Sequence, residues 1–364
     1  MGILYFLKKL LSTDDTKPIN QQTSEFSRKD SYSFDIDPIL KKKLPIGLLP
    51  GEVFLIDWIS GKSEDVNFPR YFETVYGINA PTSLKKLLNG GYVEETSVMD
   101  SLASLKLPEL KEILNTKELK VSGKKAEVIT RISENFTEDE VSSYINSRMI
   151  KRTAKGDKVL DEFYYIVPAH RNDSKDGVYN VASAIRFVSK LNYKPKNGDI
   201  SWALFQKAYM EHAEDFKYGL MRNDIRHMAA QLEKENKFKD SLLHYLRVYI
   251  LDLSGLCNSP RLEHPTIIMY DVPAKHQIKK LIEVLDYDKK ELYELFVYTW
   301  DKTLPGLKYH YLTMEECFNC LENSLEDEDE KVKKSLFNAY EKLKKDMNDK
   351  SFREKYGLEF PFEY

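Results

Sequence analysis

Apolar residues recur at helical spacing along most of this chain, and the pattern predicts a mainly α-helical protein. The clearest case begins at Pro108, which suits the first turn of a helix because its missing N–H would have no partner there. Leu110, Ile113 and Leu114 then follow at the i, i+3, i+4 spacing of one helical face. The pattern predicts a helix from Pro108 to about Lys117.

A second short helix is expected after a connection that carries two apolar residues, Leu119 and Val121. Ser122 is a good N-cap residue. Apolar residues then repeat at every third position, as Ala126, Ile129 and Ile132. Helices this short are not stable alone in water. We therefore expect the apolar faces of the two helices to pack against each other.

Further apolar elements precede this helix pair. Residues 51–60 are a strongly apolar helix or strand, and residues 68–78 have the pattern of an amphipathic helix. Another helix starts at Pro81 and ends at the pair Gly90 and Gly91, after which an extended segment is expected.

This order of elements resembles a winged-helix domain, in which the second helix enters the major groove of DNA. Lys85 and Lys86 would then lie on the exposed face of that helix. The run from Thr153 to Gly156 is similar to the segment that closes many bacterial winged-helix domains. The alternative is a small helical unit that only packs beside the next module.

Residues from about Val178 onward have a helical pattern throughout. Segments 222–236 and 239–253 resemble one tetratricopeptide-like hairpin, in which small residues let two helices approach closely. An array of such units would need about three of them, so the pattern predicts a helical bundle. Two more helices cover residues 277–300. The acidic residues 326–330 interrupt a last pair and are expected to be a solvated surface.

The pattern predicts five consecutive segments. They are a flexible polar N-terminal segment (1–31), a winged-helix-like unit (32–98), a two-helix module (99–136), a basic connector (137–177) and a helical bundle that serves protein interaction (178–364).

Residues 105–132 resemble the SAP family, whose module of two short helices binds DNA, often AT-rich. The broader order, a basic two-helix unit followed by a helical C-terminal region, resembles SAP-domain proteins of bacteria and their phages. The family pattern L-x-V-x-E-L-K-x-x-L is matched by Leu105, Leu107, Glu109, Leu110, Lys111 and Leu114. The pattern G-x-K-x-x-L-x-x-R-L is matched by Gly123, Lys125, Val128, Arg131 and Ile132. Because the family usually has glycine where this chain has Glu118, a left-handed conformation there would cost of order 1 kcal/mol.

Charge strengthens the interpretation of this segment as a DNA-binding module. The chain has a net charge of -3, but residues 101–136 contain seven Lys or Arg and five Glu, a local charge of +2. The N-terminus of the second helix is also an anion site, because its first N–H groups have no helical partners. The predicted DNA-contacting residues are Lys111, Lys120, Ser122, Gly123, Lys124, Lys125 and Arg131. Contacts of this kind predict weak, salt-sensitive binding to duplex DNA with little sequence preference. The alternative is that these lysines are only a solvated face.

A second group of cations, Lys151, Arg152, Lys155 and Lys158, follows the module. These residues either extend the DNA-binding surface or are simply solvated.

Composition excludes several classes of protein. At 42% hydrophobic and 31% charged residues the chain has the balance of a soluble globular protein, and no apolar run approaches the ~20 residues of a membrane span. Three cysteines cannot form a disulfide framework, so we expect a cytoplasmic protein. Cys317 and Cys320 have metal-ligand spacing but lack a second pair of ligands. We expect two buried thiols, with no metal and no cofactor.

The sequence carries none of the common nucleotide-binding or hydrolase motifs. It therefore predicts a non-enzymatic protein that binds duplex DNA through the SAP-like module and a protein partner through the helical C-terminal region. One alternative is a protein scaffold whose SAP-like unit is degenerate. Another is a metal-dependent DNA-processing enzyme built around His170, which Arg171 and Asp173 follow closely.

Overall fold

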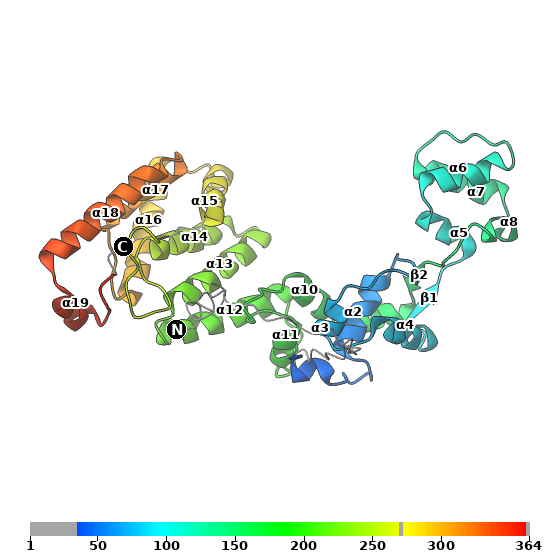
Figure 1. The fold of residues 1–364 in the computed structure, drawn as a ribbon, viewed down its shortest axis with the longest axis horizontal. Helices are drawn as coiled ribbons and strands as arrows, with labels where there is room; N and C mark the ends of the chain where they lie inside the picture. Colours follow the sequence, from blue (N-terminus) through cyan, green and yellow to red (C-terminus); the bar gives the residue numbers. More distant parts are fainter. Residues whose placement is uncertain (1–34, 269–271, 362–364) are drawn as a thin grey trace, which may run out of the picture. The chain divides into compact units, whose positions relative to one another are not determined.

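The computed structural model describes residues 35–268 and 272–361, and this part of the chain is mainly helical, as predicted (Figure 1). The predicted flexible segment 1–31 lies outside the described residues. No helix in the described part combines the length and apolar character that crossing a bilayer would require.

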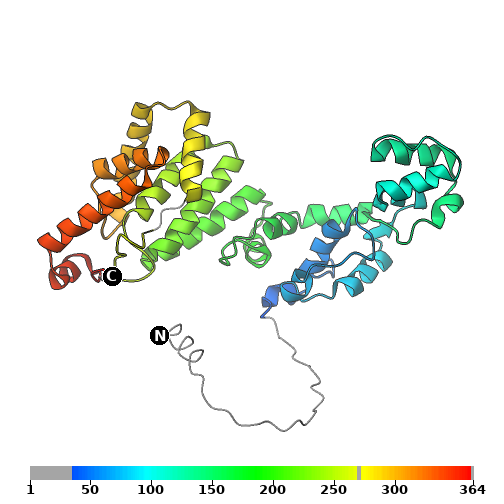
Figure 2. The same ribbon diagram turned by 45° about the horizontal axis from the view of Figure 1, so that its top comes forward.

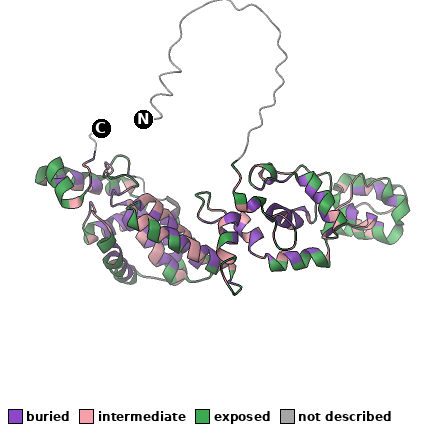
Figure 3. Cartoon of the chain, turned by 90° about the horizontal axis from the view of Figure 1, so that it is seen from below, coloured by how far each residue is buried: buried purple, intermediate pink, exposed green. Residues whose placement is uncertain are grey.

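Buried apolar side chains form three clusters. Figure 3 marks the buried positions along the chain in purple. The first cluster takes its residues from 40–93 and again from 150–228. The second lies within residues 98–141, and the third within residues 218–358.

These clusters correct the predicted division into consecutive segments. The chain leaves the first cluster after Val93, builds the second cluster, and returns to the first at Ile150. Residues 150–177, predicted to be a connector, and residues 178–205, predicted to belong to the bundle, instead complete the core of the N-terminal unit. The linear prediction failed because a packed core is defined by contacts between residues that are distant in sequence.

The first cluster is built from short helices and two strands. These elements are η1 (Pro38–Lys41), α2 (Pro50–Ile59), α3 (Tyr71–Thr74), α4 (Ala80–Asn89), β1 (Val93–Glu95), β2 (Ile150–Arg152), α9 (Ala154–Glu162), α10 (Ile166–Arg171), α11 (Val181–Val188) and part of α12 (Asn197–Glu214). Residues 51–60, predicted as helix or strand, are the helix α2.

The two strands pair antiparallel, with Glu94 opposite Lys151. On its other edge β2 meets an extended segment that follows α2. Ser63 and Met149 form an antiparallel bridge there, and the Ile150 N–H donates to the carbonyl of Lys62 over 2.8 Å. The order of elements is therefore helix, bridged segment, helix, helix, strand, strand. Residues 96–149 occupy the connection between the two strands.

The start of α9 is packed tightly against the chain that leads into β1. The Thr153 hydroxyl donates to the carbonyl of Gly91 over 2.7 Å, and the Lys155 ammonium donates to that of Gly90, also over 2.7 Å. A Cβ on Gly156 would lie 2.1 Å from the carbonyl oxygen of Tyr92. Only glycine fits this position, so the run from Thr153 to Gly156 fixes the junction between α9 and the strands.

The predicted helical hairpin is formed by α13 (Tyr218–Lys234) and α14 (Phe238–Asp252), which lie side by side in both views (Figures 1 and 2). Ala229 is buried between them, and the buried Ser241 hydroxyl donates to its carbonyl over 2.9 Å. The turn passes through Asn236 at a φ of 58°, a left-handed conformation that Asn tolerates well.

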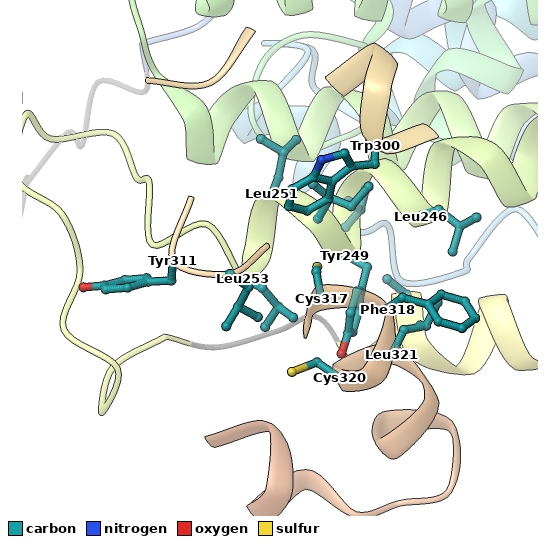
Figure 4. Packing of buried hydrophobic residues seen from close by; sticks show 14 of the residues in the cluster. Leu246, Tyr249, Leu251, Leu253, Trp300, Tyr311, Cys317, Phe318, Cys320 and Leu321 are labelled. Atoms are coloured by element: carbon teal, nitrogen blue, oxygen red, sulfur yellow. The ribbon is translucent and has the colours of Figure 1, made fainter. Parts of the chain in front are cut away.

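The remaining helices complete the third cluster. They are α15 (Val272–Leu285), α16 (Lys289–Thr303), η3 (Leu304–Gly306), α17 (Met314–Leu325), α18 (Asp329–Asp346) and α19 (Asp349–Tyr356). Figure 4 shows Cys317, Cys320 and Tyr249 within this core. Both thiols are buried, as predicted, and burial raises the pKa of Cys320 to about 11. Among the described residues, no group of three or more His, Cys, Asp or Glu side chains could hold a metal ion.

The acidic run between α17 and α18 is not simply a solvated surface. The Asp327 and Asp329 carboxylates lie 2.8 Å and 3.2 Å from the ammonium of Lys275, whose side chain is only 8% exposed. These acids therefore neutralise a buried cation of α15. The sequence interpretation missed this because Lys275 is far away along the chain.

Candidate nucleic-acid interface

The module between the two strands consists of short elements around a small core of its own. They are α5 (Val98–Ser101), η2 (Leu102–Ser104), α6 (Leu107–Asn115), α7 (Lys125–Asn135) and α8 (Glu138–Ser142). Helices α6 and α7 lie side by side (Figure 1). The predicted stripe of Leu110, Ile113 and Leu114 is completely buried, which confirms the first apolar face.

The second apolar face differs from the prediction. Val128 and Ile132 are completely buried, Ile129 is half-buried and Ala126 is exposed. At about 100° per residue, a spacing of three drifts by about 60° at each step, so Ala126 lies on a different face from Ile132. A spacing of four drifts by only about 40°, which keeps Val128 and Ile132 on one face.

The end of α6 has the left-handed residue that the sequence comparison singled out. Glu118 has a φ of 53°, and the following N–H of Leu119 donates to the Leu114 carbonyl over 3.0 Å. This is the Schellman arrangement of a helix C-terminus, in which glycine is usual at the left-handed position. Glu118 therefore carries the strain expected for a side chain in this conformation, of order 1 kcal/mol.

Helix α7 starts later than predicted. Its N-cap is Lys124 rather than Ser122, and the Lys124 N–H donates to the Glu127 carboxylate over 3.2 Å. Gly123 has a φ of 138°, and a Cβ there would meet the Glu127 carboxylate at 2.7 Å. Because the chain turns into the helix at Gly123, Ser122 is too far upstream to cap it.

Three cations of the module are held by the module itself. Arg131 Nη1 donates to the carbonyls of Lys120 and Ser122 and so fixes the connection onto α7. Lys125 Nζ donates to the carbonyl of Ala103 over 2.7 Å.

Lys117 is the third of these cations. Its ammonium donates to the Asn135 carbonyl over 2.8 Å and lies 2.7 Å from the Glu140 carboxylate. The hydrogen bond from Lys117 holds the pKa of Glu140 below its usual value.

Other cations of the module remain available to a ligand. Lys120 and Lys124 are exposed, and among the described residues their ammonium groups form no hydrogen bond or ion pair; only their main-chain groups are bonded, to Arg131 and Glu127. Lys124 is the N-cap of α7, and Lys120 lies in the connection that leads to it. Lys111 is half-buried on α6, and no contact among the described residues brings it to the start of α7. Lys106, which was not predicted as a contact, is also exposed.

The second group of cations is mostly paired. Arg152 lies 3.2 Å from Asp57 and 3.0 Å from Asp157, and Lys151 lies 3.4 Å from Glu94. The Lys155 ammonium lies 4.2 Å from the centre of the Tyr92 ring, besides its bond to Gly90. Of the four, only Lys158 has no such partner in the described part of the chain.

The two lysines of α4 also differ from each other. Lys86 lies 2.6 Å from the carboxylate of Glu52, which is 4% exposed. The Glu52 carboxylate in turn accepts the Leu49 N–H at the start of α2. Lys85 is exposed and has no ion-pair partner among the described side chains. Both lysines are exposed, as predicted, but only the Lys85 ammonium is unpaired among the described side chains.

His170 is part of an aromatic cluster. Its Nδ1 is hydrogen-bonded to the Tyr76 hydroxyl over 2.9 Å, and its ring centre lies 3.9 Å from that of Phe54. Burial lowers the pKa of His170. The neighbouring Arg171 pairs with Asp57 at 2.6 Å. His170 therefore packs among aromatic side chains, and it belongs to no group of three or more described His, Cys, Asp or Glu residues that could hold a metal ion.

Comparison with protein families gives one match. Residues 101–137 match the sequence model of the SAP domain. Searches of curated proteins and of solved structures found no significant match. The match includes all of α6 and α7 and agrees with the resemblance of residues 105–132. The chain therefore carries a SAP domain, placed between the two strands of its N-terminal unit.

Proposed function

We propose that this protein is a non-enzymatic DNA-binding protein that holds duplex DNA through its SAP domain. The match of residues 101–137 to that domain carries the proposal, because a SAP domain suggests nucleic-acid binding. The exposed lysines at the start of α7 supply a physical basis for it.

The proposed contact is a phosphate group at the N-terminus of α7. The N–H groups of Lys125, Ala126 and Glu127 have no partners within the helix, and the helix dipole favours an anion there. Lys120 and Lys124 add two exposed ammonium groups. Such contacts hold the DNA backbone without reading its sequence.

Several predicted residues act indirectly in this proposal. Arg131 shapes the connection through the carbonyls of Lys120 and Ser122, and Gly123 lets the chain turn into α7. Lys125 is anchored to the Ala103 carbonyl and keeps donors for a phosphate, since an ammonium group has three.

One observation favours the alternative of a protein scaffold with a degenerate SAP unit. Glu118 lies at the start of the connection between α6 and α7, and Glu127 lies in the first turn of α7. Both place a carboxylate in the region that would meet the phosphates. Because these carboxylates repel phosphates, we propose binding of modest affinity. The family resemblance adds the proposal of a preference for AT-rich duplexes.

The C-terminal helices are proposed to hold a protein partner. A groove of about 500 Å³ between α14 and α16 supports this role. It is lined by Tyr287 and Tyr298 together with three acids and one cation, namely Asp240, Glu291, Glu294 and Lys239. Its chemistry suits a partner segment with apolar and basic side chains.

Fluorescence anisotropy with labelled AT-rich and GC-rich duplexes at two salt concentrations tests the DNA-binding proposal. The variant Lys120→Glu plus Lys124→Glu should lose binding, because it replaces two cations at the proposed phosphate contact with carboxylates. Its fold should remain intact, because neither ammonium group has a structural partner to disturb. The matched control is Lys342→Glu plus Lys345→Glu on α18, which changes the net charge equally on exposed residues. Absence of binding by the unmodified chain at low salt would favour the scaffold.

A further inference from the structure

The SAP domain is joined to the N-terminal unit by a short, hydrogen-bonded ribbon. Only Thr96 and Ser97 separate β1 from α5. The Thr96 N–H donates to the Met149 carbonyl over 2.7 Å, and the Met149 N–H donates to the Ser101 hydroxyl over 3.2 Å. Arg148 Nη1 donates to the Thr96 carbonyl over 3.1 Å. The two chain segments that enter and leave the SAP domain are therefore hydrogen-bonded to each other and to Ser101 at the end of α5.

Helix α4 presents an exposed polar row immediately before this ribbon. Thr82, Lys85 and Asn89 lie along it at helical spacing, and within the described residues their side chains form no hydrogen bond or ion pair. At about 100° per residue they fall within an arc of about 60°. The opposite face of α4, with Leu84 and Leu87, is buried in the core.

The chemistry of this row suits the edges of DNA bases. Lysine donates to guanine, asparagine bonds adenine in a bidentate manner, and threonine serves either base or packs against the thymine methyl group. In the observed connectivity α4 also holds the position of the helix that enters the major groove in a winged-helix domain.

The length of the connection limits how far α4 can lie from the SAP domain. Eight residues, 90–97, separate the last residue of α4 from the first of α5. Even fully extended they would span at most roughly 30 Å. One turn of B-form DNA is longer, about 34 Å. A duplex that runs from the SAP domain toward α4 can therefore contact both within about one helical turn.

From these observations we infer that α4 and the SAP domain bind one duplex together, with Thr82, Lys85 and Asn89 facing the major groove. This inference rests on the proposed DNA binding by the SAP domain. The short ribbon turns the second contact into an intramolecular step with a high effective concentration, which raises overall affinity by roughly 10²-fold or more. The SAP domain supplies phosphate contacts, and α4 adds contacts to base edges.

The test measures anisotropy with duplexes of about 10 and about 24 base pairs, which are roughly one and more than two helical turns. A longer duplex offers more overlapping positions at which the protein can bind. These extra positions alone raise the apparent affinity only severalfold. Bipartite binding predicts a rise of more than about 10-fold. Lys85→Glu should abolish this excess and leave binding to the short duplex unchanged.

Lys158→Glu on α9 is the matched control, because it makes the same charge change at an exposed residue of the same unit. It should leave the excess affinity in place. Methylation of guanine N7 in the major groove of the long duplex should weaken binding of the unmodified chain and have no effect on the Lys85→Glu variant.

Two outcomes would overturn the inference. One is an equal length dependence in the unmodified chain and in Lys85→Glu. The other is a loss of the excess affinity in Lys158→Glu as well, which would indicate general charge repulsion. Failure of the proposed function is distinct, since it would appear as no binding to either duplex or as binding that survives the change at Lys120 and Lys124.

Discussion

Two groups of cations in this chain look alike in sequence and differ in structure. Around the start of α7, the Lys120 and Lys124 ammonium groups are exposed and have no partner among the described side chains. In the group at the end of β2 and the start of α9, Arg152 pairs with Asp57 and Asp157, and Lys155 is bound to the Gly90 carbonyl. The first group is available to an external anion, while most of the second group binds carboxylates and carbonyls of its own unit. A cluster of basic residues in a sequence therefore does not by itself define a binding surface.

The largest expected effect concerns the junction in which the second group lies. Gly156→Ala places a Cβ 2.1 Å from the Tyr92 carbonyl oxygen, so the start of α9 must shift. We expect a loss of about 3 kcal/mol in the free energy of unfolding, measured by urea denaturation. Gly306→Ala is the control, because a Cβ added there would meet nothing within 4 Å, and it should change stability by less than about 0.5 kcal/mol. Equal stability of the two variants would contradict the assignment of this group to a packed junction.

Reversing the charge of both exposed lysines of the first group should reduce DNA affinity about 100-fold at low salt without changing the free energy of unfolding. Lys120→Glu plus Lys124→Glu removes two phosphate contacts, so the slope of log affinity against log salt should fall by about 2. Anisotropy titrations at several salt concentrations measure both quantities. An unchanged salt slope would mean that these lysines do not contact phosphate.

Asp57→Asn tests the second group directly, because Asp57 accepts from both Arg152 and Arg171. The pairs are partly exposed, so we expect a loss of only about 1 kcal/mol in stability. DNA affinity should not fall, since the substitution releases cations rather than removing them. A clear fall in affinity with the fold intact would show that this group takes part in binding through its paired geometry.

Glu118→Gly should relieve the left-handed strain at the end of α6 and stabilise the SAP domain by about 1 kcal/mol. It also removes a negative charge near Lys120, so DNA affinity should rise by roughly 2-fold to 3-fold. Glu118→Ala separates the two effects, because it removes the charge and retains the Cβ. If Glu118→Ala stabilises the domain as much as Glu118→Gly does, strain is not the cause.

The smallest effect is expected for Lys158→Ala. Lys158 belongs to the second group by sequence but is exposed, and no described residue pairs with it. We expect a change of less than about 2-fold in affinity and less than about 0.5 kcal/mol in stability. A larger loss of affinity would extend the DNA-binding surface beyond the SAP domain to α9.

Local pattern carried enough information for most helices of the described chain. The buried stripe of α6, the cap of α16 at Asp288 and the end of α4 at Gly90 follow from residues within one or two turns of each other. The SAP motif was recognisable for the same reason. Its residues lie within a single short segment, and the departure at Glu118 marked a real left-handed position.

The candidate site was only partly predictable. The Lys120 and Lys124 ammonium groups remain exposed and unpaired with any described side chain, whereas Lys125 and Arg131 bind carbonyls of the module itself. Sequence spacing places a cation near a helix start, but it does not show which carbonyl or carboxylate the side chain meets. The start of α7 was misplaced because the turn at Gly123 outweighs the capping preference of Ser122.

The sequence by itself determined the helices and the SAP motif, since both depend on interactions between residues three or four positions apart. The tertiary structure alone decided that the SAP domain is inserted between two strands, because three-residue strands carry almost no pattern and their pairing joins Val93 to Arg152. It also decided which cations are available to a ligand. Arg152 is paired because Asp57 is brought beside it, and Asp57 lies on a helix far away in the sequence.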